Sequence, residues 1–352
     1  MLGLALDKCP YFTNPVGIAI IKNRSQSSGQ KGLLMKKEIR NSLLLILTAL
    51  VWGIAFVAQR QGGAAAGPYT FNCIRSFLGA AVLLPVIRLL DGRSESHEPQ
   101  TIQDKRRLWI GGSLCGAVLF VASTFQQMGM YYGTTAGKAG FLTACYILLV
   151  PVLGIFLGKK CRWNVWVSIL VAVVGLYFLC LTEGFSFYMS DVLLLFCAVC
   201  FSVHIMVIDH FSPLVNGVRM SCIQFLVCGV LGLVPMIAVE ILHAPGGIQG
   251  WMQMFIGWDV WIPILYAGVM SCGVGYTLQI IGQDGINPAI ASLLMSLESV
   301  FSVLAGMLIL HETMTGREVL GCVLVFAAVL FAQVNLGELQ SVWRGFRRKS
   351  EK

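Results

Sequence analysis

The sequence predicts an all-α integral membrane protein with ten transmembrane helices, arranged as two inverted-topology five-helix repeats. Three observations support this fold class. First, 57% of the 352 residues are hydrophobic and only 12% are charged, whereas roughly 25% of a soluble domain is charged. Second, the apolar segments run for about 20 residues, the length of a helix across a bilayer core of about 30 Å, and exceed the roughly 10-residue strands of membrane barrels. Third, the chain is weakly similar to itself at an offset of about 150 residues.

The apolar segments follow one another with short polar connections. They are preceded by residues 1–40, a short apolar patch and then a polar stretch; we expect this extension to be disordered, or the native start to be Met35. We assign the first repeat to residues 41–182, the second to 183–336 and a basic cytoplasmic tail to 337–352. The ten predicted spans are 42–57, 68–90, 108–131, 138–158, 163–181, 189–208, 215–242, 260–281, 288–310 and 318–334.

The internal similarity has a consequence for topology. Five helices is an odd number, so the second repeat enters the membrane in the opposite orientation to the first. Related halves of opposite orientation are typical of secondary transporters, whose substrate sites lie near the bilayer midplane between the repeats. At offsets of 152, 152 and 149 residues respectively, the comparison matches Gln127 with Gln279, Tyr146 with Glu298, and Arg75 with Gln224.

The basic residues indicate the orientation, because cytoplasmic loops hold an excess of lysine and arginine. Most of the 25 lysines and arginines fall in the N-terminal segment, the C-terminal tail and the connections on that same side. Arg75 lies within the membrane. We therefore predict a multi-pass protein of the cell (inner) membrane with both termini in the cytoplasm. Only Arg60, Lys138 and Arg317 fall on the other side.

Several classes of function are disfavoured. The net charge of +8 sits in short clusters at segment ends, without the basic face of a nucleic-acid-binding protein. The stretch GTTAGKA lacks the spacing of a phosphate-binding loop, so we expect no ATP site. Cys197 and Cys200 have no second ligand pair for zinc, and we expect no metal and no cofactor. No HExxH motif or pair of membrane aspartates occurs, so we expect no enzyme.

Four stretches resemble a known family in their order and spacing. They are LTALVWGIAF, PYTFNCIRSFLGA, TAGKAGFLTACYILLVP and SLLMSLESVFSVLAGMLILHE. Over roughly residues 41–333, the chain resembles the EamA-like branch of the drug/metabolite transporter superfamily. This resemblance implies a ten-helix carrier of small organic molecules, frequently amino acids or other metabolites that leave the cell.

Arg75 is the strongest candidate for a substrate-binding residue. A charge near the centre of a membrane helix costs roughly 2.5 to 3.5 kcal/mol on insertion scales, so it normally faces a cavity or a partner. Asn72, Ser76 and Gly79 share its helix face by their spacing. One interpretation is a clamp for a substrate carboxylate, which the guanidinium fork suits. The other is a structural pair with Glu298 that locks two helices together.

The remaining titratable candidates also have two interpretations each. Glu298 is a proton-coupling or substrate-binding carboxylate, or a hydrogen-bonded residue that closes a helix interface. His204 is a proton relay or a satisfied core histidine. Lys138 extends to the headgroups or lines the outer mouth of a cavity with Tyr146.

Amide and aromatic side chains complete the candidate set. Buried amides in a membrane need partners on another helix or on a ligand. Trp52 is a cavity wall or ordinary packing. The candidates for substrate binding are Arg75, Asn72, Trp52, Gln126, Tyr146 and Glu298, and those for coupling or gating are Glu298, His204, Lys138, Gln127 and Gln279.

These observations favour a secondary transporter that exports an amino acid or small organic acid by alternating access. Cationic candidates in the first repeat and an anionic one in the second suit a zwitterion or a small carboxylate. The partners expected are the substrate and the lipid bilayer, and a homodimer is compatible with the sequence. The alternative is a membrane channel or sensor without a carrier cycle.

Overall fold

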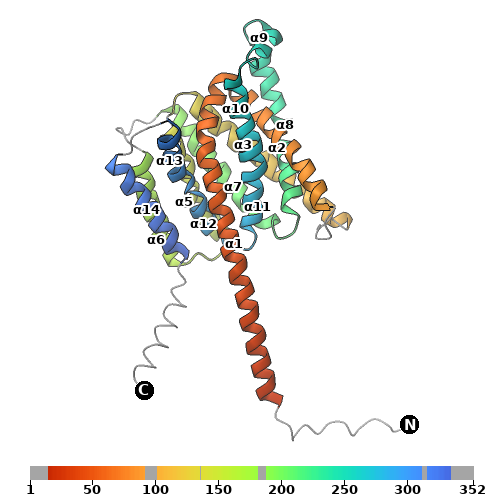
Figure 1. Ribbon diagram of the computed structural model, residues 1–352, viewed down its shortest axis with the longest axis vertical. Helices are drawn as coiled ribbons and strands as arrows, with labels where there is room; N and C mark the ends of the chain where they lie inside the picture. Colours follow the sequence, from red (N-terminus) through yellow and green to blue (C-terminus); the bar gives the residue numbers. More distant parts are fainter. Residues whose placement is uncertain (1–14, 92–100, 135, 181–187, 311–314, 334–352) are drawn as a thin grey trace, which may run out of the picture.

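The computed structural model describes residues 15–91, 101–134, 136–180, 188–310 and 315–333, and its regular structure there is entirely helical (Figure 1). Within these residues, eight stretches are long and apolar enough to cross a membrane, and Trp163–Leu179 is apolar but shorter. The protein is a multi-pass membrane protein. The eight stretches are Met35–Ala66, Pro68–Leu89, Ile102–Tyr131, Ala139–Phe156, Met189–Phe211, Gly217–Ile241, Trp258–Gln283 and Pro288–Ala305.

The first helix is longer than the span predicted from hydropathy. Helix α1 runs over Pro15–Ala66, and its N-terminal part projects from the bundle (Figure 1). Lysine, arginine and glutamate are good helix formers, so a helix continues past the apolar run that crosses the membrane. The described part of the extension is thus helical, and residues 1–14 lie outside the described residues. Gly67, at φ 83°, ends α1 before the proline that begins α2.

Helices from the two halves of the chain interleave in the bundle. Helices α2 (Pro68–Asp91) and α3 (Ile102–Tyr131) pack against α7 (Met189–Phe211) and α8 (Gly217–Pro235). The peripheral pair consists of α6 (Trp163–Cys180) and α14 (Gly316–Gln333). These two helices approach closely at Gly321, where an added Cβ would lie 2.7 Å from the carbonyl oxygen of Gly175. Small residues permit such close contact between membrane helices.

Two predicted spans that were read as continuous helices are interrupted. The span predicted at 138–158 consists of α4 (Ala136–Ala144) and α5 (Tyr146–Phe156), and the span at 288–310 of α12 (Pro288–Met295) and α13 (Glu298–Leu310). Tighter i to i+3 bonds replace helical bonds at both breaks, including Leu148 N to Cys145 O at 3.1 Å and Ser299 N to Ser296 O at 3.2 Å. Ser296 Oγ also donates to Leu293 O at 2.8 Å, a local bond that competes with the helix.

A third span changes its helical type along its length. It comprises α10 (Trp258–Leu265), the π-helical segment η2 (Tyr266–Gly275) and α11 (Tyr276–Gln283). Pro263 lies inside α10, and a proline removes a backbone donor and displaces the preceding turn. Helix α8 likewise passes after Pro235 into a π-helical segment, η1 (Met236–Ile241). The short α9 (Gly247–Gln253) follows.

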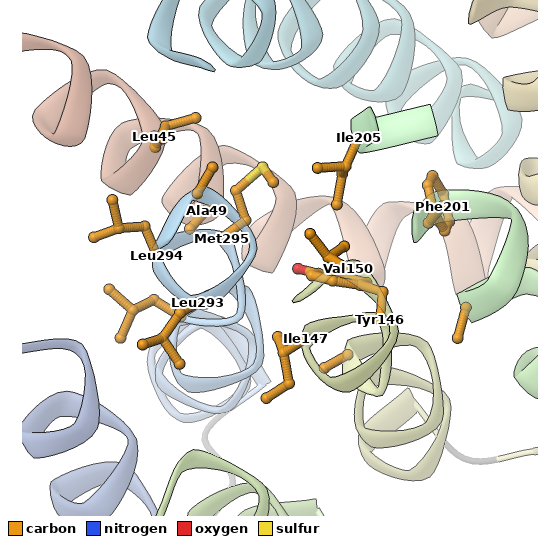
Figure 2. Close-up of a cluster of buried hydrophobic side chains, with 14 of the residues drawn as sticks. Leu45, Ala49, Tyr146, Ile147, Val150, Phe201, Ile205, Leu293, Leu294 and Met295 are labelled. Carbon is orange, nitrogen blue, oxygen red and sulfur yellow. The ribbon is translucent and has the colours of Figure 1, made fainter. Parts of the chain in front are cut away.

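The centre of the bundle is an apolar core around the second broken helix. Figure 2 shows Leu293, Leu294 and Met295 of α12 between α1 and α5, with α7 beyond α5. Their neighbours in this core are Leu45 and Ala49 of α1, Tyr146, Ile147 and Val150 of α5, and Phe201 and Ile205 of α7. Both helix breaks are therefore held inside the protein rather than against lipid, where freed backbone groups would be costly.

The bundle has two ends that differ in charge. At the end we call the basic end, α1 enters the bundle and the chain turns between α7 and α8 and between α11 and α12. The end that holds α9 is called the opposite end (Figure 1). Among the described residues, the ion pairs lie at the basic end and are Lys37 with Asp284, Lys159 with Asp209, and Arg219 with Asp91.

Candidate functional site

A polar and aromatic cavity lies among α1, α2, α3, α4, α5, α7, η2, α11 and α13. It encloses about 370 Å³ of space between protein atoms, and this figure includes part of the open solvent at its mouth. Both halves of the chain contribute. The lining residues are Trp52, Phe56, Gln59, Arg75, Gln126, Thr143, Tyr146, Phe201, Ser271, Tyr276 and Glu298.

Arg75 brings an uncompensated positive charge to this cavity. Its side chain is buried at 5% exposure. The guanidinium lies over the Phe71 ring, 5.3 Å from the centroid. Within the described part of the chain, Arg75 has no ion pair within 4.0 Å and donates no hydrogen bond, so the predicted structural pair with Glu298 is not formed. A buried charge is costly unless paired, so the site calls for an anionic group or water.

Glu298 is the first residue of α13, directly after the break in the second broken helix. Its carboxylate accepts a hydrogen bond from the Tyr146 hydroxyl at 3.2 Å, and it is 4% exposed. The amides at a helix N-terminus carry partial positive charge and stabilise a nearby carboxylate. Tyr146 is itself the first residue of α5. The two broken helices therefore place their breaks at the same site.

The two charged residues lie at different depths along α1. Gly53 packs on the backbone of α13, because a Cβ there would lie 2.8 Å from Glu298 O; a Cβ at Gly62 would meet the Phe71 ring. Gly53 and Gly62 are nine residues apart on α1, which rises 1.5 Å per residue. Arg75 lies one helical turn from Phe71 in the direction of Glu298. The backbones of Arg75 and Glu298 therefore differ in depth by about 7 Å. The cavity thus has a cationic part nearer the opposite end and an anionic part near the middle of the bundle.

Five of the predicted candidates line the cavity, namely Trp52, Arg75, Gln126, Tyr146 and Glu298. The others lie elsewhere. Asn72 donates to Ser123 O at 3.0 Å, and Gln127 donates to Gln59 O at 2.9 Å. Both are interhelical bonds.

The remaining candidates lie outside the cavity lining or beyond the described side chains. Gln279 is buried at 1% exposure. His204 Nε2 lies 3.1 Å from Gln224 Oε1, in a hydrogen bond behind the aromatic wall of the cavity. The side chain of Lys138 lies outside the described residues.

Some lining residues were not among the predicted candidates. Gln59 and Phe56 lie on the same face of α1 as Trp52, at spacings of seven and four residues, and this periodicity was available in the sequence. Tyr276 had no such signal, because the π-helical η2 before it shifts the face that the following residues present. The remaining unanticipated lining residues are Thr143, Phe201 and Ser271.

Two side chains of α1 offer unused hydrogen-bonding atoms. The Trp52 Nε1 donor and the Gln59 Oε1 acceptor are buried and have no partner among the described residues. Buried polar atoms without partners are rare in folded proteins. They lie about 10 Å apart along the helix axis, since seven residues separate them. In the described part of the chain, no group of three or more His, Cys, Asp or Glu residues is arranged to hold a metal ion.

An all-helical bundle that crosses the membrane several times and encloses a polar cavity with an unpaired charge has the architecture of a membrane transporter. The profile of the EamA-like transporter family matches residues 40–181 and again residues 188–333. The chain belongs to this family, and thus to the drug/metabolite transporters that its motifs resemble.

Two further comparisons agree. Over 312 residues the chain is 29% identical to a protein of Archaeoglobus fulgidus described as an uncharacterized transporter. The aligned region covers 88% of this chain and 90% of that protein. The fold also matches a solved structure described as a crystal structure of a protein, with a TM-score of 0.66 and 20% sequence identity. The match covers 83% of this chain and 96% of that chain. At this identity, the second likeness concerns the fold alone.

Proposed function

We propose that the protein is a secondary transporter that moves a small dipolar metabolite, an amino acid or a small organic acid, out of the cell by alternating access. The carrier cycle uses ten membrane crossings arranged as two inverted five-helix repeats, at residues 41–182 and 183–336, with both termini in the cytoplasm. The main observation in support is the Arg75 guanidinium, buried in the cavity without an anionic partner among the described residues.

The charge pattern of the cavity favours a zwitterion over a lipophilic cation. A substrate carboxylate on Arg75 would replace the missing partner with charge-assisted hydrogen bonds, which are about twice as strong as neutral ones. A substrate ammonium would lie deeper, beside Glu298. The depth of about 7 Å between the two residues leaves room for a ligand to lie between them. The apolar part of the substrate would pack on Phe56, Phe201 and Tyr276, which line the cavity.

The positions of the helix breaks support the inverted repeat. The first residues after the breaks, Tyr146 and Glu298, are 152 residues apart, the same offset that relates the two halves in sequence. Discontinuous helices at equivalent positions in two inverted halves are typical of secondary transporters, where they form the substrate and coupling sites. Glu298 is the coupling candidate, since a carboxylate shared between a substrate ammonium and a proton couples the two movements.

A counterflow experiment tests the carrier. Purified protein is reconstituted in proteoliposomes that are loaded with one amino acid or small carboxylic acid at a time, and uptake of the same labelled compound from outside is measured. We expect saturable uptake that is stimulated by the unlabelled compound inside. Uptake that never saturates and is not stimulated in this way indicates a channel and would overturn the carrier cycle. The sign of the stimulation by an imposed proton gradient then reports coupling.

A further inference from the structure

We propose that His204 and Gln224 form a second polar half-site, nearer the basic end, which takes over the polar end of the same dipolar ligand. In this structure the half-site is sealed by an ionic layer made of the three ion pairs at the basic end. This inference rests on the proposed carrier function and extends it, because it names the residues that the ligand meets after it leaves Arg75.

The half-site has unused hydrogen-bonding capacity. His204 and Gln224 are both fully buried, with exposed fractions of 0%, and they are bonded to each other at 3.1 Å. His204 Nδ1 and Gln224 Nε2 have no partner among the described residues. Two orphaned polar atoms next to each other in a dry interior are costly. A state in which water or a ligand reaches them would satisfy both.

The half-site lies directly behind the wall of the cavity. The His204 ring packs edge-on against Tyr276, with centroids 5.9 Å apart, and against Phe201 at 6.5 Å. Both aromatic residues line the cavity that holds Arg75 and Glu298. These two rings therefore lie between the cavity and His204.

Further buried polar groups lead from the half-site towards the basic end. Thr277 donates to Ser221 Oγ at 2.9 Å. Thr277 follows Tyr276 in the chain, and Ser221 lies one helical turn from Gln224 on α8. Gln283 Nε2 donates to Ile205 O at 3.3 Å. Gln283 Oε1 is buried and has no partner in the described part of the chain. Polar side chains along a path through a membrane bundle mark routes that become hydrated.

The ionic layer closes this path. Lys37 Nζ lies 2.7 Å from Asp284, and Lys159 Nζ lies 2.8 Å from Asp209. Each pair joins a residue before 182 to one after 183, as does the Arg219 pair with Asp91 at 2.6 Å. Breaking them therefore removes the described ionic links between the two halves at this end.

The layer lies close to the half-site along the same helices. Asp209 follows His204 by five residues on α7, and Arg219 precedes Gln224 by five residues on α8. Five residues correspond to about 7.5 Å of helix. Gln283 is the neighbour of Asp284. Opening of the ionic layer thus exposes the polar path over little more than one helical turn.

The position of Gln224 indicates its role in the cycle. The internal repeat matches it with Arg75, at an offset of 149 residues. In an inverted repeat, the surfaces that line the outer pathway in one state correspond to those that line the inner pathway in the other. A neutral amide holds a carboxylate less tightly than a guanidinium does. Because Gln224 Oε1 only accepts, His204 Nε2 is the donor of the bond between them and Nδ1 is an acceptor. The ligand carboxylate is therefore bound by charge at Arg75 and handed to one neutral donor, the Gln224 amide, on the side where it is released.

Chemical labelling of histidine tests the sealed half-site without a known substrate. Purified full-length protein is treated with diethyl pyrocarbonate, and the modification rate of each histidine is measured by mass spectrometry of peptides. His210 and His243 are exposed and serve as internal references in every sample. We expect His204 to react at least tenfold more slowly than either reference. Equal rates in the unaltered protein would overturn the seal.

Neutral variants of the ionic layer complete the test. In the triple variant Asp91→Asn, Asp209→Asn, Asp284→Asn, we expect labelling of His204 to rise at least fivefold with both references unchanged. The matched control is Asp259→Asn, an exposed aspartate on α10, which should leave the rate unchanged.

Further variants separate opening of the ionic layer from unfolding. The single variant Asp209→Asn, with the most buried of the three carboxylates at 10% exposed, should give a smaller rise. The exchanged pair Lys159→Asp, Asp209→Lys should return the rate towards that of the unaltered protein. Unchanged labelling in a folded triple variant overturns the half-site but not the carrier, whereas absence of counterflow in the unaltered protein overturns the carrier whatever the labelling shows.

Discussion

Arg75 and Gln224, two buried polar groups that the weak internal similarity of the sequence aligns, behave differently in this structure. Arg75 faces a cavity and has no anionic partner among the described residues. Gln224 is bonded to His204 in a region with no exposed surface. Depth in the membrane therefore does not by itself decide whether a polar group meets a ligand; access from the cavity does.

The difference also separates two ways of burying polarity. A neutral hydrogen-bonded pair is tolerated in a dry interior, because each partner satisfies part of the hydrogen-bonding capacity of the other. An unpaired charge is not, since desolvation of an ion costs several kcal/mol even after relaxation. The chain accepts this cost at Arg75 because the cavity leaves the guanidinium accessible to water or to a ligand. The comparison predicts large effects at Arg75 and smaller ones with increasing distance from it.

The largest effect is expected for Arg75→Ala. Removal of one partner of a buried charge pair costs about 2–5 kcal/mol, so we expect the affinity for a transported compound to fall by about 30-fold or more. Arg75→Lys should recover part of this loss, because lysine retains the charge but not the fork geometry. The matched control is Arg88→Ala, which changes an exposed arginine in the last turn of α2. Concentration dependence of counterflow measures all three, and equal loss in both alanine variants would refute the assignment.

A smaller effect is expected for Glu298→Gln. Glutamine has the same shape and can still accept the bond from Tyr146, but it cannot attract a substrate ammonium or release a proton. We expect affinity for zwitterions to fall by about tenfold, corresponding to about 1.4 kcal/mol, while affinity for simple carboxylates changes little. Stimulation of uptake by a proton gradient should disappear. Asp259→Asn, an exposed carboxylate change, is the control. Equal losses for zwitterions and simple carboxylates would argue against contact with an ammonium.

The sequence was sufficient to predict which charged residues share the cavity, and it was insufficient where backbone geometry decides. Arg75 and Glu298 were detectable because a charge within an apolar span has few places to lie. The helix breaks were not, since 138–158 and 288–310 read as uninterrupted apolar runs and the break depends on local serine and turn bonds. Tyr276 was not found because a π-helical segment precedes it and changes the face that it presents.

The pairing of charges was equally hard to predict. Both a clamp and a structural pair were consistent with one arginine and one glutamate in the same membrane layer. The structure separates them, because Glu298 is bonded to Tyr146 and the described residues form no ion pair with Arg75; the packing of Gly53 and Gly62 also sets the neighbouring helices at different depths. Similarly, periodicity along α1 would have added Gln59 to the candidates, but a glutamine about two turns from a helix end is also a common interfacial residue.

A moderate effect is expected for Tyr146→Phe. This change removes the hydrogen bond of 3.2 Å to Glu298 and keeps the aromatic packing in the core (Figure 2). A hydrogen bond to a charged group contributes about 1.5–3 kcal/mol when buried, and a neutral one about 1 kcal/mol. We expect a three- to tenfold loss of zwitterion affinity and a loss of stability of about 1–3 kcal/mol. Tyr177→Phe, at a half-exposed site, should have no effect on either quantity in ligand-binding and thermal-unfolding measurements.

The smallest effect concerns the opposite end, where the described ion pairs do not link the two halves of the chain. There Glu240 of η1 accepts bonds from the backbone amides of Tyr69 at 2.9 Å and Thr70 at 2.6 Å. These are unpaired donors of the first turn of α2, and Gly67 before them has no side chain to cap them, so a carboxylate from the other half of the chain takes that role.

Glu240→Gln retains one acceptor but loses the charge at the helix N-terminus. A cap of this kind contributes about 1 kcal/mol, so we expect a fall of about 2 °C in the midpoint of thermal unfolding. Diethyl pyrocarbonate labelling of His204 should not change, because the ionic layer at the basic end is intact. Asp259→Asn again provides the control near the same end. A rise in His204 labelling would mean that the two ends open together, which alternating access forbids, and would contradict the separation of the cavity from the half-site of His204 and Gln224.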